Sequence, residues 1–526
     1  MTNSQSHIRS SSVVIHSVLL VLILLLLIDQ SRFLFTYPVP DTGMWFGDES
    51  WTMLTARAFA ATGVAHMPEA IGSSLAYSNG LINGSIWITG LLYGIPATFL
   101  ALLASPVAIG RSMTMLLSIV TLLISIRASR LLTEDRIAVS LSVLALVSCD
   151  AFAFSSHSAR FDTATGLATL AYLVFLWRLL ERGKSTKPIT SFAIVFLGVL
   201  SLAIYVHVPT LIALPALYAL WRIDALRNWR CLLSALAGLL GGSMILVGAY
   251  WATTGSVDLL GHGYNQYYNV ANSLPILHPF SWQVQKINTI DRAVQVWQVA
   301  WPLVLLMIIG VLFRIWKRHR FTASQVDWLM LSALTLVGWC AFEGPAVFYN
   351  IHILPVVAVC CAVTLGPLLQ MRLTPILATI GMVAIAVLTI MRQESYGRVA
   401  QKITRENSLE SFLESAHDSF ILVDEPALNE VAYYERSHAG SNLHLMTKHF
   451  LLFGAENRSP AEILRDHNVR YLLLYSTVRW QSQLRPIADS FYTVIGERTG
   501  HLTDQARSYC DPRWDDIDTL RLYQSR

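Results

Sequence analysis

Residues 13–28 read VVIHSVLLVLILLLLI, an apolar run of the kind that crosses a membrane as a helix. Arg9 precedes the run, and Asp29-Gln30-Ser31-Arg32 follows it. A cleaved signal peptide would have a shorter apolar region and a cleavage site of small residues, and this stretch has neither feature. We therefore interpret residues 12–29 as an uncleaved first transmembrane span.

The composition extends this interpretation to the whole chain. Of its 526 residues, 54% are hydrophobic and only 14% are charged, and the mean hydropathy is +0.49. Soluble domains carry about 25% charged residues, so lipid must form part of the solvent around this protein. The candidate spans, about eleven in all, are 12–29, 107–126, 137–155, 163–180, 190–207, 208–222, 231–251, 297–316, 326–342, 346–369 and 374–391.

Lysine and arginine set the predicted orientation, because cytoplasmic loops carry an excess of both. They cluster at 127–136, 178–187, 222–230, 314–320 and, weakly, at Arg372. All of these fall on the cytoplasmic side only if the apolar stretch 83–104 stays outside, as a juxtamembrane or re-entrant segment. Three glycines and Pro96 make this stretch a poor straight helix. The protein is therefore predicted to lie in a cell inner or plasma membrane. Its N-terminus is predicted on the cytoplasmic side and the chain after Met391 on the outer side.

The predicted architecture is an all-α polytopic membrane domain, residues 1–392, followed by a small extracytoplasmic α/β domain, residues 393–526. Residues 420–423 (FILV) and 471–475 (YLLLY) have the composition of buried strands. Ser459 and Pro460 are typical of a helix cap and a first helical residue. Most of the cysteines lie in apolar stretches, so no disulfide framework is predicted.

The first outer loop, 30–106, carries the adjacent acids Asp48 and Glu49 close to the exit of the first span. A carboxylate there could deprotonate an acceptor hydroxyl or hold a divalent cation. The structural alternative is that either acid caps the amphipathic helix predicted at 50–62.

The second outer turn places His157, Arg160 and Asp162 between two apolar spans. Ionisable groups so close to hydrocarbon are costly and usually pair or serve a pathway. Arg160 suits a phosphate, whereas Asp162 suits a metal ion, an arginine or the start of the next span. A local Arg–Asp pair that closes the turn is the structural alternative. Because the predicted topology puts this turn on the same face as Asp48, we predict one shared site.

Further polar residues lie at other outer boundaries. His207 ends one predicted span, whereas Glu343, Tyr349 and His352 accompany a late one. They could bind sugar or phosphate oxygens, or they could be interfacial anchors. The large outer loop, 252–296, is rich in aromatic and amide side chains, which suit a carbohydrate or a lipid headgroup as well as anchoring.

Several common sites are missing from the sequence. It contains no Walker loop, dinucleotide fingerprint, Cys/His metal ladder or Gly-x-Ser-x-Gly elbow. A cytoplasmic nucleotide-dependent site is therefore not supported, and no nucleic-acid partner is expected. An enzyme at the outer face lacks access to nucleotide sugars and needs a donor delivered on a membrane lipid.

In their order and sidedness, these motifs resemble the GT-C glycosyltransferase superfamily. The matching motifs are Asp48-Glu49, the helix ending at 60–63 (AATG), Gly110-Arg111, Arg160-x-Asp162 and the late stretch 349–355 (YNIHILP). The branch most similar is that of the protein O-mannosyltransferases and aminoarabinose lipid A transferases, glycosyltransferase families 39 and 83. The resemblance covers residues 10–400, approximately.

The resemblance implies an inverting transferase that moves a sugar from a polyprenyl-phosphate donor to a glycan, lipid or protein acceptor. By motif position, it implies Asp48 as the general base, Glu49 as its supporting acid, Asp162 as the second-loop acid and Arg160 as a contact to the donor phosphate. The resemblance implies no particular cofactor, and it leaves a divalent cation possible. The sequence departs from the family at 77–80 (YSNG), where a Pro-Pro stretch is usual, and at His352, near which an Arg or Lys often lies.

Two other functions fit the same membrane setting: a polysaccharide polymerase or ligase, and a transporter of a lipid-linked sugar. A transporter is expected to place ionisable residues near the middle of its spans, at interrupted helices. Here they cluster at span ends on one face, with Asp150 as the nearest exception. This pattern favours the enzyme.

Overall fold

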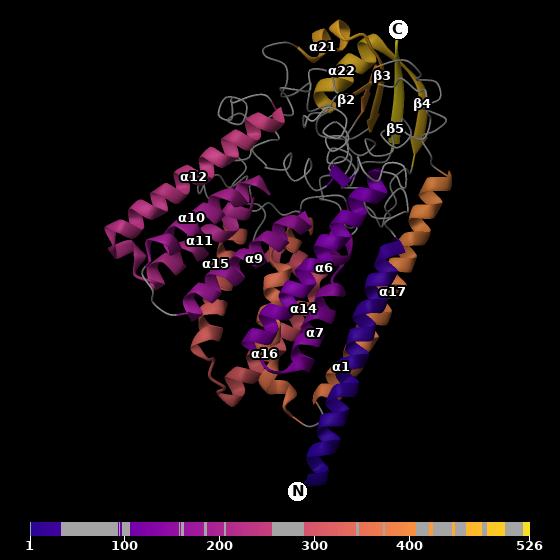
Figure 1. Ribbon diagram of the computed structural model, residues 1–526. Coiled ribbons are helices and arrows are strands. Elements are labelled where there is room, and N and C mark those ends of the chain that lie inside the picture. Colours follow the sequence, from indigo (N-terminus) through magenta and orange to yellow (C-terminus); the bar gives the residue numbers. More distant parts are fainter. Residues whose placement is uncertain are drawn as a thin grey trace.

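The computed structural model describes a helical bundle and a small sheet beyond one end of it (Figure 1). The described residues are 2–32, 93, 95–96, 106–156, 158, 162–182, 187–204, 207–254, 289–342, 347–371, 374–406, 420–423, 444–447, 459–475, 481–499 and 519–526. The bundle helices are α1 (Thr2–Ser31), α6 (Pro106–Leu132), α7 (Arg136–Val147), α8 (Asp150–Ser156), α9 (Asp162–Glu181), α10 (Pro188–Leu200), α11 (His207–Arg222), α12 (Trp229–Thr254), α14 (Thr289–Lys317), α15 (Ala323–Phe342), α16 (Leu354–Leu369) and α17 (Thr374–Glu406). The short 3-10 helices are η5 (Ser201–Ala203), η6 (Ala225–Arg227) and η7 (Val347–His352).

Six of the described helices are long and apolar enough to cross a membrane: α1, α6, α9, α12, α14 and α17. The pair α7 and α8, bent by 70°, is a possible seventh span, and shorter apolar helices cover 188–203, Val208–Arg222 and Leu354–Leu369. Large apolar side chains stay exposed along these helices, as lipid-facing residues do. The protein is therefore a mostly helical, multi-pass integral membrane protein. The count of about eleven spans stays a prediction.

Two apolar clusters form the core of the bundle, and α16 contributes to both. One cluster packs α7 and α16 against α1, α14 and α17, and the other packs α9, α11 and α15 against α16. Almost every residue of α16 is buried, which its uniformly apolar sequence allows. This central helix begins directly after η7, so it fixes the position of His352.

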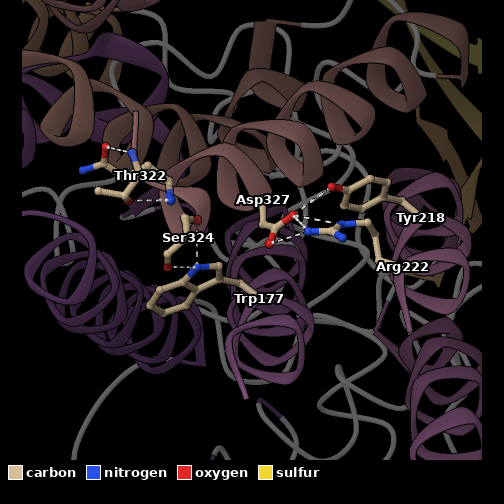
Figure 2. Close-up of polar contacts among 7 residues, drawn as sticks. Trp177, Tyr218, Arg222, Thr322, Ser324 and Asp327 are labelled. Carbon is tan, nitrogen blue, oxygen red and sulfur yellow. Dashed lines mark hydrogen bonds and ion pairs between the residues drawn. The ribbon is translucent and has the colours of Figure 1, made fainter. Parts of the chain in front are cut away.

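The helix ends that adjoin the basic clusters gather at one end of the bundle. The Trp177 indole donates to the hydroxyl and carbonyl of Ser324, at 3.0 and 3.1 Å. Arg222 donates to both carboxylate oxygens of Asp327, at 3.0 and 3.2 Å (Figure 2). Gln325 donates to the Leu132 carbonyl at 2.8 Å. The ends of α6, α9 and α11 thus meet the start of α15, and we name this end of the molecule the basic end.

The other end of the bundle is named here the site end, and it contains Gln30, Asp150, Asp162 and Arg392. Gln30, near the end of α1, donates to the Val147 carbonyl at 3.0 Å, and Arg392 in α17 pairs with Asp150 at 2.7 Å. Helices α1 and α17 therefore finish at the same end, beside α8 and on the side of the sheet (Figure 1).

The helix ends that flank the predicted first outer loop both lie at the site end. Helix α6 finishes at the basic end, so its first residue, Pro106, lies at the site end, as does Ser31. That 83–104 stays on the outer side remains a prediction. Most of that stretch lies outside the described residues, but the Tyr93 hydroxyl lies 2.9 Å from that of Thr114 in α6.

The predicted span at 137–155 is interrupted, because the chain bends by 70° between α7 and α8. A break releases backbone carbonyls from the helix, and buried carbonyls need partners. Here Gln30 donates to the Val147 carbonyl, and Thr389 lies 3.4 Å from the Ser148 carbonyl. Both donors belong to helices far away in the sequence, so the local pattern did not reveal the break.

The C-terminal sheet is small and mixed. Its order is β2 (His444–Thr447), β1 (Phe420–Val423), β3 (Val469–Tyr475), β5 (Thr519–Ser525) and β4 (Tyr492–Thr499), with α21 (Pro460–Asp466) and α22 (Gln481–Phe491) beside it. The β1 pairs are parallel and the β5 pairs antiparallel. The predicted strands at 420–423 and 471–475 are confirmed, and so is the helix start, where Ser459 and Glu462 form a capping box.

Candidate active site

The structure brings together two residues that the sequence singled out separately, Asp162 and His352. The Nε2 atom of His352 lies 3.0 Å from Oδ1 of Asp162, although the residues are 190 positions apart. Their side chains are 2% and 0% exposed. Ionisable groups buried this deeply are costly unless paired, so the contact stabilises both. With Asp162 ionised, the Nε2–H of His352 donates to it.

Local structure explains where Asp162 stands. It is the first residue of α9, where a negative charge interacts favourably with the helix dipole. The next residue, Thr163, donates its hydroxyl to the Ser155 carbonyl of α8 at 2.8 Å. This bond ties the start of α9 to the end of α8. The sequence left open a metal ion, an arginine or the start of the next span as partners of Asp162. The structure places it at the start of α9 and adds another partner, an imidazole from a distant element.

His352 reaches Asp162 because η7 and α9 approach closely at Gly166. A Cβ atom at Gly166 would lie 2.5 Å from the Ile351 carbonyl oxygen, closer than van der Waals contact permits. Glycine is therefore required one turn after Asp162. This requirement is invisible in the sequence, where Gly166 appears as an ordinary small residue in an apolar span.

We expect Gly166→Ala to destabilise the protein by about 1–3 kcal/mol, since the backbone of η7 must shift to accept the methyl group. The shift would also separate His352 from Asp162 and lower any activity that depends on the pair. Thermal unfolding of the purified protein measures the effect. Gly248→Ala is the matched control, because a Cβ there meets nothing within 4 Å. Equal stability of both variants and the wild type would contradict the packing argument.

The remaining predicted site residues are described only in part. Residues 48, 49, 157, 160 and 343 lie outside the described residues. His207 is the first residue of α11 and Tyr349 lies in η7, and only their backbone is described. Because α11 finishes at the basic end, His207 begins it at the site end. The described candidates thus share one end of the molecule.

Arg111 belongs to the Gly110-Arg111 motif, which by itself assigns this side chain no role. It lies in α6, five residues after Pro106, and it is 1% exposed. A cation buried near the end of an apolar helix is costly, and such residues often serve binding sites in membrane proteins. The signal was present in the sequence, as a single arginine within an otherwise apolar stretch.

The described residues contain no group of three or more His, Cys, Asp or Glu side chains that could hold a metal ion. The pair of Asp162 and His352 supplies one carboxylate and one imidazole. Together they can fix the orientation of the imidazole and hold a proton between the two groups.

Comparison with known proteins identifies the class of fold. No family model and no curated protein matches the chain. Among solved structures, it is similar to ArnT from Cupriavidus metallidurans in the apo state, with a TM-score of 0.50, 11% identity and 98% of both chains covered. It is also similar to the same protein bound to undecaprenyl phosphate, with a TM-score of 0.49, 10% identity and 97% of both chains covered.

The match shows the class of fold, that of a solved membrane protein of similar length. The particular fold is that of ArnT, along nearly the whole chain. This likeness of fold agrees with the resemblance seen in the sequence.

Proposed function

We propose that this protein is an inverting glycosyltransferase that moves a sugar from a polyprenyl-phosphate donor to an acceptor at the outer face of the membrane. The observation that supports this most is the buried contact between Asp162 and His352. These residues come from two motifs of one transferase branch, and the fold places them against each other. The fold likeness to apo ArnT supports the class. ArnT itself has been crystallised with undecaprenyl phosphate, a lipid of the proposed donor class.

The proposed topology has about eleven spans, with the basic end in the cytoplasm and the site end outside. This topology is supported by hydrogen bonds that join the ends of α6, α9 and α11 to the start of α15. The basic stretches adjoin these helix ends. An excess of Lys and Arg marks the cytoplasmic side. The C-terminal domain, 393–526, then lies outside with the site.

In the proposed reaction, the Asp48 carboxylate takes the proton of an acceptor hydroxyl as its oxygen attacks the anomeric carbon. The bond between that carbon and the donor phosphate oxygen breaks, and its electron pair leaves with the phosphate. Attack from the opposite side inverts the anomeric centre. Arg160 stabilises the charge that develops on the phosphate, because fixed donors act strongly on developing charge in a site shielded from water.

The other candidates have positioning and binding roles in this proposal. Glu49 supports Asp48, whereas Asp162 fixes the imidazole of His352 for a hydrogen bond to a sugar or phosphate oxygen. His157, His207, Glu343 and Tyr349 are proposed substrate contacts at the same face. We add Arg111 as a candidate phosphate contact because it is buried near the site end of α6.

A transporter of a lipid-linked sugar is the second candidate, favoured by two interrupted helices. Helices α7 and α8 meet at 70°, and α14 has non-helical backbone at Ala300, two residues before Pro302. Interrupted helices are common at transporter binding sites near the membrane midplane. The break after α7, however, lies beside Gln30 and Asp150 at the site end, where α1 and α17 finish. This position favours an enzyme.

A transfer assay separates the two functions. Purified full-length protein is incubated with a panel of polyprenyl-phosphate sugars and acceptors, and release of polyprenyl phosphate is measured. A transferase is expected to release it together with a glycosylated acceptor. A transporter would instead move the intact donor across proteoliposome membranes with no release, and that result would overturn the proposal.

A further inference from the structure

A cavity of about 320 Å³ lies at the site end among α8, α14 and α17. This volume is at the lower end of the range of about 300–1000 Å³ that ligand pockets occupy. Its polar lining comes from Ser148, Asp150, Thr389 and Arg392, and its apolar lining includes Trp301 and Leu388. The proposed transfer reaction assigns no role to any of these residues.

Two breaks in the helices create the space. Helix α7 stops at Val147 and α8 departs at 70°, and α14 has non-helical backbone at Ala300. Pro302 lacks the backbone N–H that a regular helix would use, which explains why α14 deviates there. Side chains of α17 close the third side of the cavity.

The cavity holds one buried anion and one cation. Nη1 of Arg392 lies 2.7 Å from Oδ2 of Asp150. The Asp150 side chain is only 10% exposed, whereas that of Arg392 is 41% exposed and can turn toward a ligand. A buried carboxylate beside a cation that reaches solvent is well suited to bind a molecule with both charges.

An unsatisfied hydroxyl adds an independent indication of a ligand. Ser148 is 3% exposed, and its hydroxyl has no hydrogen-bond partner among the described residues. A buried hydroxyl without a partner costs free energy, so a polar group in the cavity would satisfy it. Nearby, the Thr389 hydroxyl donates to the Ile385 carbonyl at 2.9 Å, which leaves its oxygen able to accept.

The cavity lies where lipid headgroups are found. Arg392 is the last residue of the candidate span Thr374–Arg392, so it marks the boundary between hydrocarbon and headgroups. Leu388, one turn earlier, is 58% exposed and faces lipid. A phospholipid could therefore place its chains along α17 and its headgroup in the cavity.

We propose that this cavity binds the zwitterionic headgroup of an aminophospholipid, separately from the sugar donor. Arg392 contacts the lipid phosphate, whereas Asp150 accepts from the primary ammonium. Ser148 and Thr389 complete the hydrogen bonds to the headgroup. One anion and one cation match this headgroup. A choline headgroup has no N–H to donate to Asp150, and an anionic glycerol headgroup would leave that carboxylate without a cation.

The test is lipid binding to the full-length protein, measured by native mass spectrometry from detergent with short-chain probes. The probes are phosphatidylethanolamine, phosphatidylcholine and phosphatidylglycerol with identical chains. We expect the ethanolamine lipid to bind about tenfold more tightly than either of the others, the effect of one charge-assisted hydrogen bond. Equal binding of all three lipids, or a preference for the glycerol lipid, would overturn the proposal.

Variants assign the binding to the cavity. Asp150→Asn is expected to abolish the preference for ethanolamine over choline, and Arg392→Gln is expected to weaken binding of both. Arg32→Gln is the matched control, because Arg32 also forms an ion pair at the site end and is similarly exposed, at 40%. It should leave the preference intact. An unchanged preference for ethanolamine over choline in Asp150→Asn would refute the assignment. The comparison of the three lipids on the wild-type protein does not depend on the folding of any variant.

Discussion

Replacing Asp48 with asparagine is expected to abolish sugar transfer and leave folding and membrane insertion intact. Asparagine has nearly the same shape but cannot take the proton of an acceptor hydroxyl. A general base contributes about 10²–10⁴-fold to a rate, so transfer should fall by at least about 100-fold. The rate of polyprenyl-phosphate release by the purified variant, with a donor that the wild type uses, measures the effect.

Asp41→Asn provides the matched control for Asp48, because Asp41 lies in the same outer loop seven positions earlier. It removes the same charge from the loop and should retain activity near that of the wild type. Full activity in Asp48→Asn would exclude Asp48 as the base. If both variants lost activity equally, the charge of the loop, rather than one carboxylate, would be responsible.

Breaking the pair of Asp162 and His352 is expected to have the largest effect on stability. Removal of one partner leaves the other buried without its hydrogen bond, and such losses cost about 3–5 kcal/mol. Asp162→Ala and His352→Ala should therefore each lower the free energy of unfolding strongly. The double variant should lose much less than the sum, because neither polar group then remains buried alone. Thermal unfolding of the four proteins measures this coupling.

Two further variants separate the structural role of the pair from its role in substrate binding. His352→Gln can keep a hydrogen bond to Asp162, so it should recover much of the stability but not the transfer rate. Asp489→Asn is the stability control, since it removes an exposed pair with Arg485 at 3.9 Å. Exposed pairs contribute about 0–1 kcal/mol. Additive losses in the double variant would show that the two side chains do not act together.

The features that the sequence predicted correctly depend on short stretches of chain. The apolar run after Arg9 predicted α1, and the strand and cap signals predicted β1, β3 and the start of α21. The basic clusters predicted which helix ends share a side. Each of these signals acts through residues within one helix, one strand or one loop, so no knowledge of distant packing was needed.

The site was predictable only as a set of candidates. Asp162 and His352 were chosen for their chemistry at span ends, but their contact required α9 and η7 to approach at Gly166. The pair of Asp150 and Arg392 was not predicted, because the two residues belong to different helices far apart in the sequence. In the sequence, Asp150 is only an exception to the pattern of charges at span ends.

The sequence by itself determined that the chain crosses the membrane many times, which helix ends are basic, and where the polar candidates lie along the chain. Hydropathy, charge and capping fix these properties locally. Only the tertiary structure decided that α7 breaks at Val147, that His352 reaches Asp162, and that Arg392 lies against Asp150. Those contacts join residues more than 100 positions apart, and they form only when the packing of whole helices brings polar groups together inside an apolar bundle.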